Sequence, residues 1–307
     1  MEKRATHTPL FTKTESGLLI QTGNSSDFSR RDSSSYLSVK QRGLDLQDLY
    51  RTNELAIHPT SYLAKLIEDT ATLSDAWLCN DQSRATALHL FSASQLDRVA
   101  TAALPLGVSV QAKEYLNALL TGSLDLLSRD RSKAKDTLWE LELWEMLNRF
   151  GMHATLEEPD IVVSFDGARV GIACKKFYSE NNVSKVLSEA IAQFESDFDF
   201  GIVAVNLDDL TPASTILKAA SLDQMSELIS QHNYSFIQRH ERHLRKYLVP
   251  GRAIAALVST SVIADVPTTK TRFFNSRQST IWNIPGLSEQ KERQMKNFFL
   301  AVNAAHV

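Results

Sequence analysis

The chain has 307 residues, 43% of them hydrophobic and 22% charged, a composition typical of a globular protein rather than a disordered, fibrous or membrane one. Its 33 basic and 36 acidic residues leave a formal net charge of −3, so any surface that attracts nucleic acid must be local. Cys79 and Cys174 lie far apart and fit neither a disulfide scaffold nor a cysteine-type zinc site.

The start of the chain and its apolar runs set the expected location. No run approaches the roughly 20 apolar residues that span a bilayer, and the opening stretch MEKRATHTPLFTKTESG resembles no signal peptide. We therefore expect a soluble, cytoplasmic protein with no membrane partner.

Three regions follow one another in the sequence. Residues 1–43 are rich in Ser and Thr and lack apolar periodicity, which predicts a flexible tail. Residues 44–129 repeat apolar side chains at helical spacing, which predicts a helical accessory domain used for packing or dimerisation. Residues 130–307 form the third region, in which helices and strands alternate.

The elements predicted in the third region define its class. They are a helix over 131–150 ending at Gly151, a hairpin over 160–175, a helix over 183–196, a strand over 200–206, a helix over 222–247 and a strand over 253–258. This order predicts an α/β (α+β) fold with a mixed sheet that packs against helices.

The hairpin has a strong local signal. Asp166-Gly167 between two β-rich runs predicts a two-residue type I′ turn. In that register Asp160 lies opposite Ala173, which makes Asp160 and Lys175 diagonal neighbours about 7–8 Å apart at the backbone. The opposite face of the hairpin is wholly apolar and comprises Ile161, Val163, Val170, Ile172 and Cys174.

The helix before the hairpin adds a third polar group. Glu140 shares the apolar stripe of this helix with Leu143 and Leu147, whereas Glu142 and Glu145 are expected on the solvent side. An isolated ionised carboxylate costs several kcal/mol to bury. Glu140 must therefore be paired, protonated or bound to a metal ion.

A helical Glu, an Asp that opens a hairpin and a Lys that closes it resemble the PD-(D/E)XK nuclease superfamily, with its restriction-endonuclease-like αβββαβ core. The resemblance covers roughly residues 131–207, or extends through 258. It implies that Glu140, Asp160 and Lys175 are catalytic and that Glu140 and Asp160 hold Mg²⁺, or Mn²⁺ in its place. Lys175 would orient or activate the attacking water.

One position departs from the family pattern. The acidic residue expected two positions before the lysine is Ala173 here. Glu140 is the first candidate for the missing carboxylate, and Glu157 and Glu158 are further candidates. Two acidic ligands are the minimum expected of such a site, since Mg²⁺ is usually held by one or two carboxylates with water and phosphate.

Several basic residues are candidates for nucleic-acid contacts. Arg169 and Lys176 are expected to flank the site, while Arg239, Arg242 and Lys246 form a stripe on the helix over 222–247 that either tracks phosphates or is a solvated face. Gln193 lies on the helix after the hairpin, where some members of the family carry a functional Gln. The alternative is an ordinary surface glutamine.

The leading hypothesis is a metal-dependent nuclease that hydrolyses DNA, in restriction, repair or antiphage defence, and that acts as a homodimer because cutting both strands commonly needs two sites. A second hypothesis is a degenerate nuclease domain that binds nucleic acid or a partner without cleavage. A third is a helical interaction protein with an incidental α/β domain. At the level of single residues, Asp160 could merely start a strand, Lys175 could be a strand-end charge, and Glu140 could pair with a buried Arg.

Overall fold

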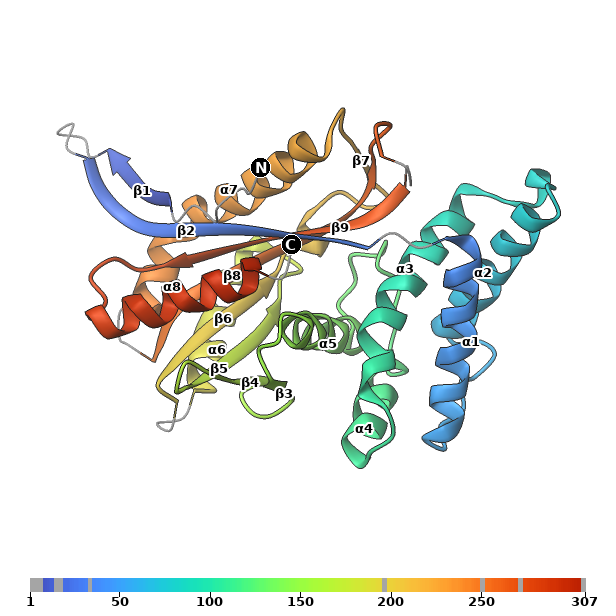
Figure 1. Cartoon of the computed structure of the whole chain (residues 1–307), viewed down its shortest axis with the longest axis horizontal. Coiled ribbons are helices and arrows are strands. Elements are labelled where there is room, and N and C mark those ends of the chain that lie inside the picture. Colours follow the sequence, from blue (N-terminus) through green and yellow to red (C-terminus); the bar gives the residue numbers. More distant parts are fainter. Residues whose placement is uncertain are drawn as a thin grey trace.

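A mixed sheet of nine strands crosses the molecule, as the computed structural model of the chain shows for residues 8–13, 19–32, 35–194, 198–248, 252–269 and 273–304 (Figure 1). The strands are β1 (Thr8–Lys13), β2 (Leu19–Asp32), β3 (Ala154–Thr155), β4 (Ile161–Phe165), β5 (Ala168–Lys176), β6 (Phe200–Asn206), β7 (Ile216–Lys218), β8 (Ala253–Asp265) and β9 (Phe273–Asn283). Their order across the sheet is β1-β2-β9-β8-β6-β5-β4-β3, and β7 pairs with β8.

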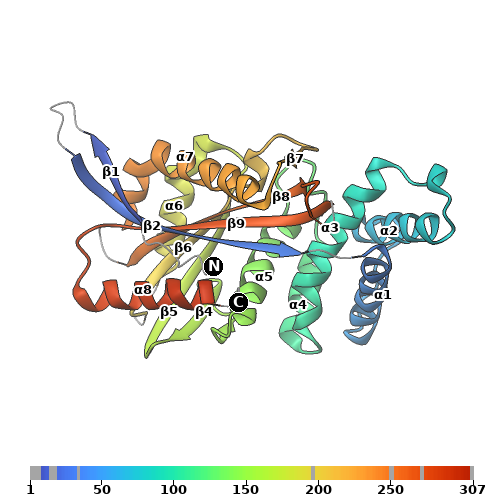
Figure 2. The ribbon, with the colours of Figure 1, turned by 45° about the horizontal axis from the view of Figure 1, so that its top comes forward.

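The described residues contain eight α-helices. They are α1 (Tyr36–Thr52), α2 (Tyr62–Leu78), α3 (Ala87–Ala103), α4 (Val110–Leu119), α5 (Lys133–Arg149), α6 (Val183–Ala192), α7 (Leu222–Leu248) and α8 (Glu289–Ala304). Helices α1 to α4 lie at one end of the molecule, where α1, α2 and α3 contact one another, and α5 lies between this group and the sheet (Figures 1 and 2). None of the helices in the described part of the chain is both long and apolar enough to cross a membrane.

Strand alternation divides the interior into two main apolar layers. Ile172, Ile202 and Leu257 point toward α5 and α8, in a cluster that continues through α3 and α4. Val203 and Val258, one residue further along their strands, point to the other face, which α6 and α7 cover. The sheet is thus covered by helices on both sides, as expected for its parallel β5-β6-β8 segment.

Local signals explain several helix boundaries. Ser35, Ser61 and Ser109 cap the starts of α1, α2 and α4, where each hydroxyl accepts a backbone N–H three residues ahead. Helix α5 ends where predicted, because Gly151 adopts a positive φ of 73° just beyond it. The strand over 200–206 and the helix starting at residue 222 also match the predicted ranges.

The segment predicted as a flexible tail differs from that prediction where the structure describes it. Residues 24–32 of β2 pair with β9, the first part of β2 pairs with β1, and residues 36–43 of the predicted tail already belong to α1. Residues 1–7, 14–18 and 33–34 of the predicted tail lie outside the described residues. The polar composition of β2 misled the sequence analysis, because Asp27 accepts hydrogen bonds from Thr280 and Tyr234, which are distant in sequence.

Candidate functional site

The hairpin forms with the predicted register. Asp166 and Gly167 occupy its turn with φ values of 51° and 72°, as a type I′ turn requires. Val163 pairs with Val170 and Ile161 with Ile172 across β4 and β5. This register brings Asp160, directly before β4, next to the end of β5.

Asp160 and Lys175 meet at that end of the hairpin. The Asp160 Oδ2 atom accepts a hydrogen bond of 2.6 Å from the backbone N–H of Cys174 and lies 3.5 Å from the Lys175 Nζ atom. The two side chains are 17% and 20% exposed, respectively. Burial raises the pKa of Asp160 above its ordinary value, although the Lys175 ammonium and the Cys174 N–H oppose the shift.

Glu140 reaches the same place from the middle of α5. Burial, followed by the nearby Asp160 carboxylate, raises the pKa of Glu140 to about 8, and Lys175 acts in the opposite direction. The structure thus brings together the three residues singled out from the sequence. We call Glu140, Asp160 and Lys175 the acid–lysine site.

The donor set of the acid–lysine site fits a hard divalent cation. The Asp160 carboxylate opposes the ionisation of the neighbouring Glu140 carboxyl group, and a divalent cation bound between them would relieve this opposition. Within the residues that the structure describes, no group of three or more His, Cys, Asp or Glu side chains is placed to hold a metal ion. Any ion held here would therefore rely on two carboxylates, with water or substrate completing its coordination.

Ala173, the position at which an acidic residue was expected, is not exposed to solvent. Ala173 is fully buried in the apolar layer under α6 and α7. Of the substitute acids, Glu158 contributes to the electrostatics of both Glu140 and Asp160. The Glu157 carboxylate instead lies 3.8 Å from the Arg169 guanidinium. Glu158 therefore acts on the charges of the acid–lysine site, but among the described residues it does not complete a group of three ligands.

Two further side chains border the acid–lysine site. Gln193 donates a 3.0 Å hydrogen bond to the carbonyl of Pro159, the residue before Asp160, so it is not the ordinary surface glutamine of the alternative. Tyr115 of α4 belongs to the helical region, and burial together with Glu140 and Asp160 raises its pKa. The position of Tyr115 could not be predicted from the sequence, because nothing local links α4 to a hairpin more than 40 residues later.

Lys176 and Arg169, the two residues predicted to contact phosphate beside the site, both lie in positions other than the predicted one. Lys176 is 3% exposed and its Nζ lies 2.7 Å from Asp209, so the prediction that it meets phosphate is wrong for this structure. Arg169 lies six residues before Lys175 on one strand, about 20 Å away at 3.3 Å per residue, so it does not flank the acid–lysine site. Its guanidinium packs over the ring of Phe198.

The basic stripe of α7 is on the surface. The side chains of Arg242 and Lys246 are exposed. Arg239 is also exposed, but its guanidinium pairs with Glu180 at 2.6 Å, and His240 contacts the same carboxylate at 2.8 Å. Arg242 and Lys246 therefore remain candidates for phosphate contact, and Arg239 is the weaker one.

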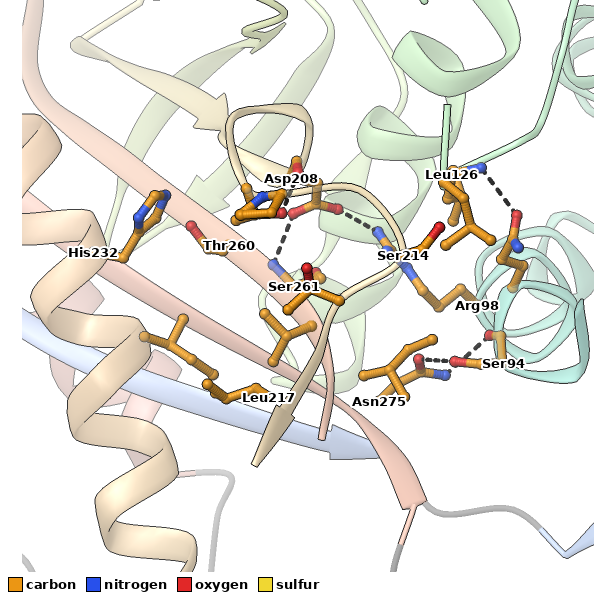
Figure 3. Close-up of a pocket in the computed structure, with 18 of the residues that line it drawn as sticks. Ser94, Arg98, Leu126, Asp208, Ser214, Leu217, His232, Thr260, Ser261 and Asn275 are labelled. Atoms are coloured by element: carbon orange, nitrogen blue, oxygen red, sulfur yellow. Dashed lines mark hydrogen bonds and ion pairs between the residues drawn. The ribbon is translucent and has the colours of Figure 1, made fainter. Parts of the chain in front are cut away.

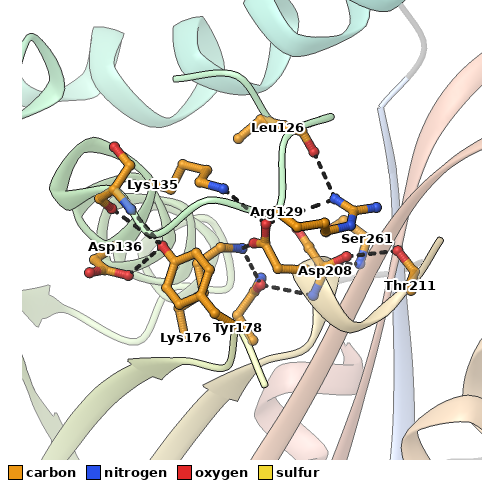
Figure 4. A network of polar contacts seen from close by, with 12 residues as sticks. Leu126, Arg129, Lys135, Asp136, Lys176, Tyr178, Asp208, Thr211 and Ser261 are labelled. Carbon is orange, nitrogen blue, oxygen red and sulfur yellow. Dashed lines mark hydrogen bonds and ion pairs between the residues drawn. The ribbon is translucent and has the colours of Figure 1, made fainter. Parts of the chain in front are cut away.

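A buried ion-pair network fills the space between α3, α5 and the sheet (Figure 4). Asp209 accepts Lys135 at 2.9 Å and Lys176 at 2.7 Å, and the guanidinium of Arg129 lies 3.8 Å away. The second half of the network comprises Arg98, Glu142, Asp208 and Arg277. No local pattern predicts this network, because its members are scattered from residue 98 to residue 277.

The structure places Glu142 in a buried position rather than the predicted solvent-facing one. It was placed on the solvent side of its helix, yet it is 8% exposed and pairs with both Arg98 and Arg277. Burial would raise its pKa, but Arg277 and Arg98 together hold that pKa below its ordinary value. Glu145 is buried as well, at 7% exposure, because α5 packs against helices on the side away from the sheet.

These features define an α/β protein with a mixed sheet and a partly buried acid–lysine site at the end of a hairpin. No protein-family model, curated protein or solved structure matches the chain.

Proposed function

We propose that the chain is a metal-dependent nuclease of the restriction-endonuclease-like fold that hydrolyses DNA phosphodiester bonds. The observation that carries the proposal is the convergence of Glu140, Asp160 and Lys175 from a helix and both strands of a hairpin. The element order from α5 through β3, β4, β5 and α6 to β6 supports it, since it reproduces αβββαβ. A homodimer belongs to the same proposal, because duplex cleavage commonly needs two sites.

Each residue has a defined part in the proposed reaction. Glu140 and Asp160 would hold Mg²⁺ or Mn²⁺, which when bound neutralises phosphate charge and lowers the pKa of a water molecule. Lys175 would orient the attacking water and stabilise the charge that develops on the phosphate oxygens. Asp160 also fixes the Lys175 ammonium, at 3.5 Å, and is itself fixed by the Cys174 N–H.

Cleavage by point variants tests the assignment. The purified chain should cut plasmid and linear DNA with Mg²⁺ or Mn²⁺ and not with EDTA. Asp160→Asn and Lys175→Ala should each lower the rate by at least a hundredfold, because removing a group that stabilises transition-state charge typically has an effect of this order. Cleavage is measured from the loss of supercoiled plasmid over time.

Matched controls come from the exposed face of α6. Lys185→Ala and Glu189→Gln alter a surface pair whose side chains are 77% and 57% exposed, and they should leave cleavage unchanged. Full activity of both Asp160→Asn and Lys175→Ala would defeat the proposed site.

The degenerate-domain alternative is favoured by one observation, the buried Ala173 where the family has an acid. Under that alternative DNA binds without a divalent ion and is not cut. Mn²⁺ should then leave the melting temperature unchanged, whereas under the leading proposal Mn²⁺ raises it and Asp160→Asn removes the increase.

A further inference from the structure

A cavity of about 220 Å³ lies between the helical region and the sheet (Figure 3). Arg98 of α3 lies on one side, His232 of α7 and Leu217 of β7 lie on the other, and Ser261 of β8 lies between them. The loop that follows Asp208 covers part of it. None of the three residues of the acid–lysine site lines this cavity.

The walls of the cavity are largely apolar. The aliphatic side chains come from four separate parts of the chain and include Leu126, Leu217, Leu228, Ile229 and Val262. Leu228 is 39% exposed and so lies where the cavity meets solvent. A concave apolar surface with a few convergent polar groups is the usual form of a small-molecule site.

Several basic side chains gather beside one side of the cavity. Three cations, Arg129, Lys135 and Lys176, share the single carboxylate of Asp209. The two lysines are nearly inaccessible and contact it at under 3 Å, whereas Arg129 lines the cavity, is 29% exposed and is 3.8 Å from it.

Arg98 also lines the cavity, but two carboxylates already neutralise its positive charge. Its guanidinium contacts Glu142 at 2.8 Å and Asp208 at 2.7 Å. Within the described part of the chain, Arg129 makes one other polar contact, a 3.2 Å hydrogen bond to the carbonyl of Leu126. Arg129 is therefore the cavity cation best able to take an additional anionic partner.

Two polar atoms of cavity-lining residues need partners. The Nε2 atom of His232 and the Oγ atom of Ser261 are buried, and neither has a hydrogen-bond partner among the described residues. Buried polar atoms are satisfied in the great majority of cases, so these two atoms depart from the usual pattern.

We propose that this cavity binds a small organic anion with an apolar body, whose carboxylate or phosphate group meets Arg129 while the body contacts the aliphatic walls. Carboxylates and phosphate monoesters share the chemistry that Arg recognises. The proposal is independent of the nuclease proposal, because it uses no residue of the acid–lysine site.

Calorimetric titration of the full chain tests the proposal with defined probes. Hexanoate and hexyl phosphate supply the anion on an apolar body, hexanamide is the neutral analogue, and inorganic phosphate has no apolar body. At least one of the two organic anions should bind at least tenfold more tightly than both hexanamide and inorganic phosphate. Whichever organic anion binds more tightly identifies the preferred source of the charge.

Two variants locate the binding. Arg129→Gln should weaken the organic anion at least tenfold and leave hexanamide unchanged, whereas Arg131→Gln, a matched control 82% exposed, should change neither. Leu228→Trp should abolish binding of every organic probe by filling the cavity at its rim. Circular dichroism verifies that each variant is folded, and if Arg129→Gln does not fold, Leu228→Trp alone decides.

Three results would overturn the proposal. The first is no binding of either organic anion at millimolar concentration. The second is equal weakening by Arg129→Gln and Arg131→Gln, which would indicate general surface charge. The third is undiminished binding in Leu228→Trp, which would place the anion elsewhere on the surface.

Discussion

Two glutamates in one helix show how neighbours decide the chemistry of a side chain. Glu140 is partly buried near another carboxylate, and its pKa is raised to about 8. Glu142, two residues later, lies between two guanidinium groups that lower its pKa. Both carboxyl groups are shielded from water, so the sign of the neighbouring charge accounts for the difference.

The raised pKa of Glu140 predicts a pH dependence of stability. Without a metal ion, the folded chain keeps the Glu140 proton up to about pH 8, while the unfolded chain loses it near the ordinary value of 4.5. The folded state therefore binds more protons between these values, and the free energy of unfolding should fall as pH rises from 5 to 8. Urea unfolding in EDTA across this range measures the slope.

The matched comparison for this prediction is between two Glu→Gln variants. Glu140→Gln should flatten the slope, since Gln has no proton to lose, whereas Glu189→Gln on the exposed face of α6 should keep it. An unchanged slope in Glu140→Gln would show that Glu140 titrates normally in the folded chain.

The pairing of Asp160 with Lys175 could be predicted from the sequence, because it depends only on the local geometry of one hairpin. A two-residue turn fixes the hairpin register, and strand alternation then places Asp160 beside Lys175. The partner of Lys176 could not be predicted from the sequence in the same way. Asp209 lies beyond α6 and β6, so only the assembled sheet brings the two together.

At the scale of elements, α5 behaves as an interior helix rather than a surface one. Its Trp139 donates a hydrogen bond to the Ala204 carbonyl of β6 in the sheet, and α5 also packs on α3 and α4. A helical-wheel analysis assumes one apolar stripe and a solvent face. Here the second face is buried and polar, so the sequence pattern misplaced Glu142.

The polar strand β9 could not be predicted from the hydropathy pattern for a related reason. Strand β9 is buried between β2 and β8, yet Ser276, Gln278 and Ser279 lie within it. Such a segment has neither an apolar run nor the alternation that predicts a half-buried strand. Its Ser279 hydroxyl contacts Ser259 of β8, which is a tertiary contact that local hydropathy does not record.

Removing the charge of Glu142 should be strongly destabilising. Glu142→Gln leaves the buried Arg98 and Arg277 guanidinium groups short of a counter-charge, and breaking a buried ion pair in this way costs about 3–5 kcal/mol. Glu54→Gln alters an 85% exposed partner of Lys113 and should change stability by less than about 1 kcal/mol. Equal unfolding free energies for the two variants, from urea titration, would contradict this.

At the scale of the whole molecule, one apolar cluster joins the helical region to the sheet. Leu46 of α1 and Leu96 of α3 belong to the same cluster as Leu138 of α5 and Ile161 of β4. The division at residues 129 and 130, drawn from sequence pattern, therefore does not coincide with a break in the core. A shared core favours a single cooperative unfolding transition.

Thiol labelling tests whether the helices and the sheet unfold together. Leu96→Ala removes a fully buried side chain of α3 and should cost about 2–5 kcal/mol. If the core is shared, Leu96→Ala should speed labelling of Cys174, the buried sheet thiol, by the factor that corresponds to this loss, while the exposed Cys79 reacts quickly throughout. Leu88→Ala, 66% exposed in the first turn of the same helix, should leave the labelling rate of Cys174 unchanged. A destabilised Leu96→Ala chain that still protects Cys174 at the original rate would mean that the helices open separately from the sheet.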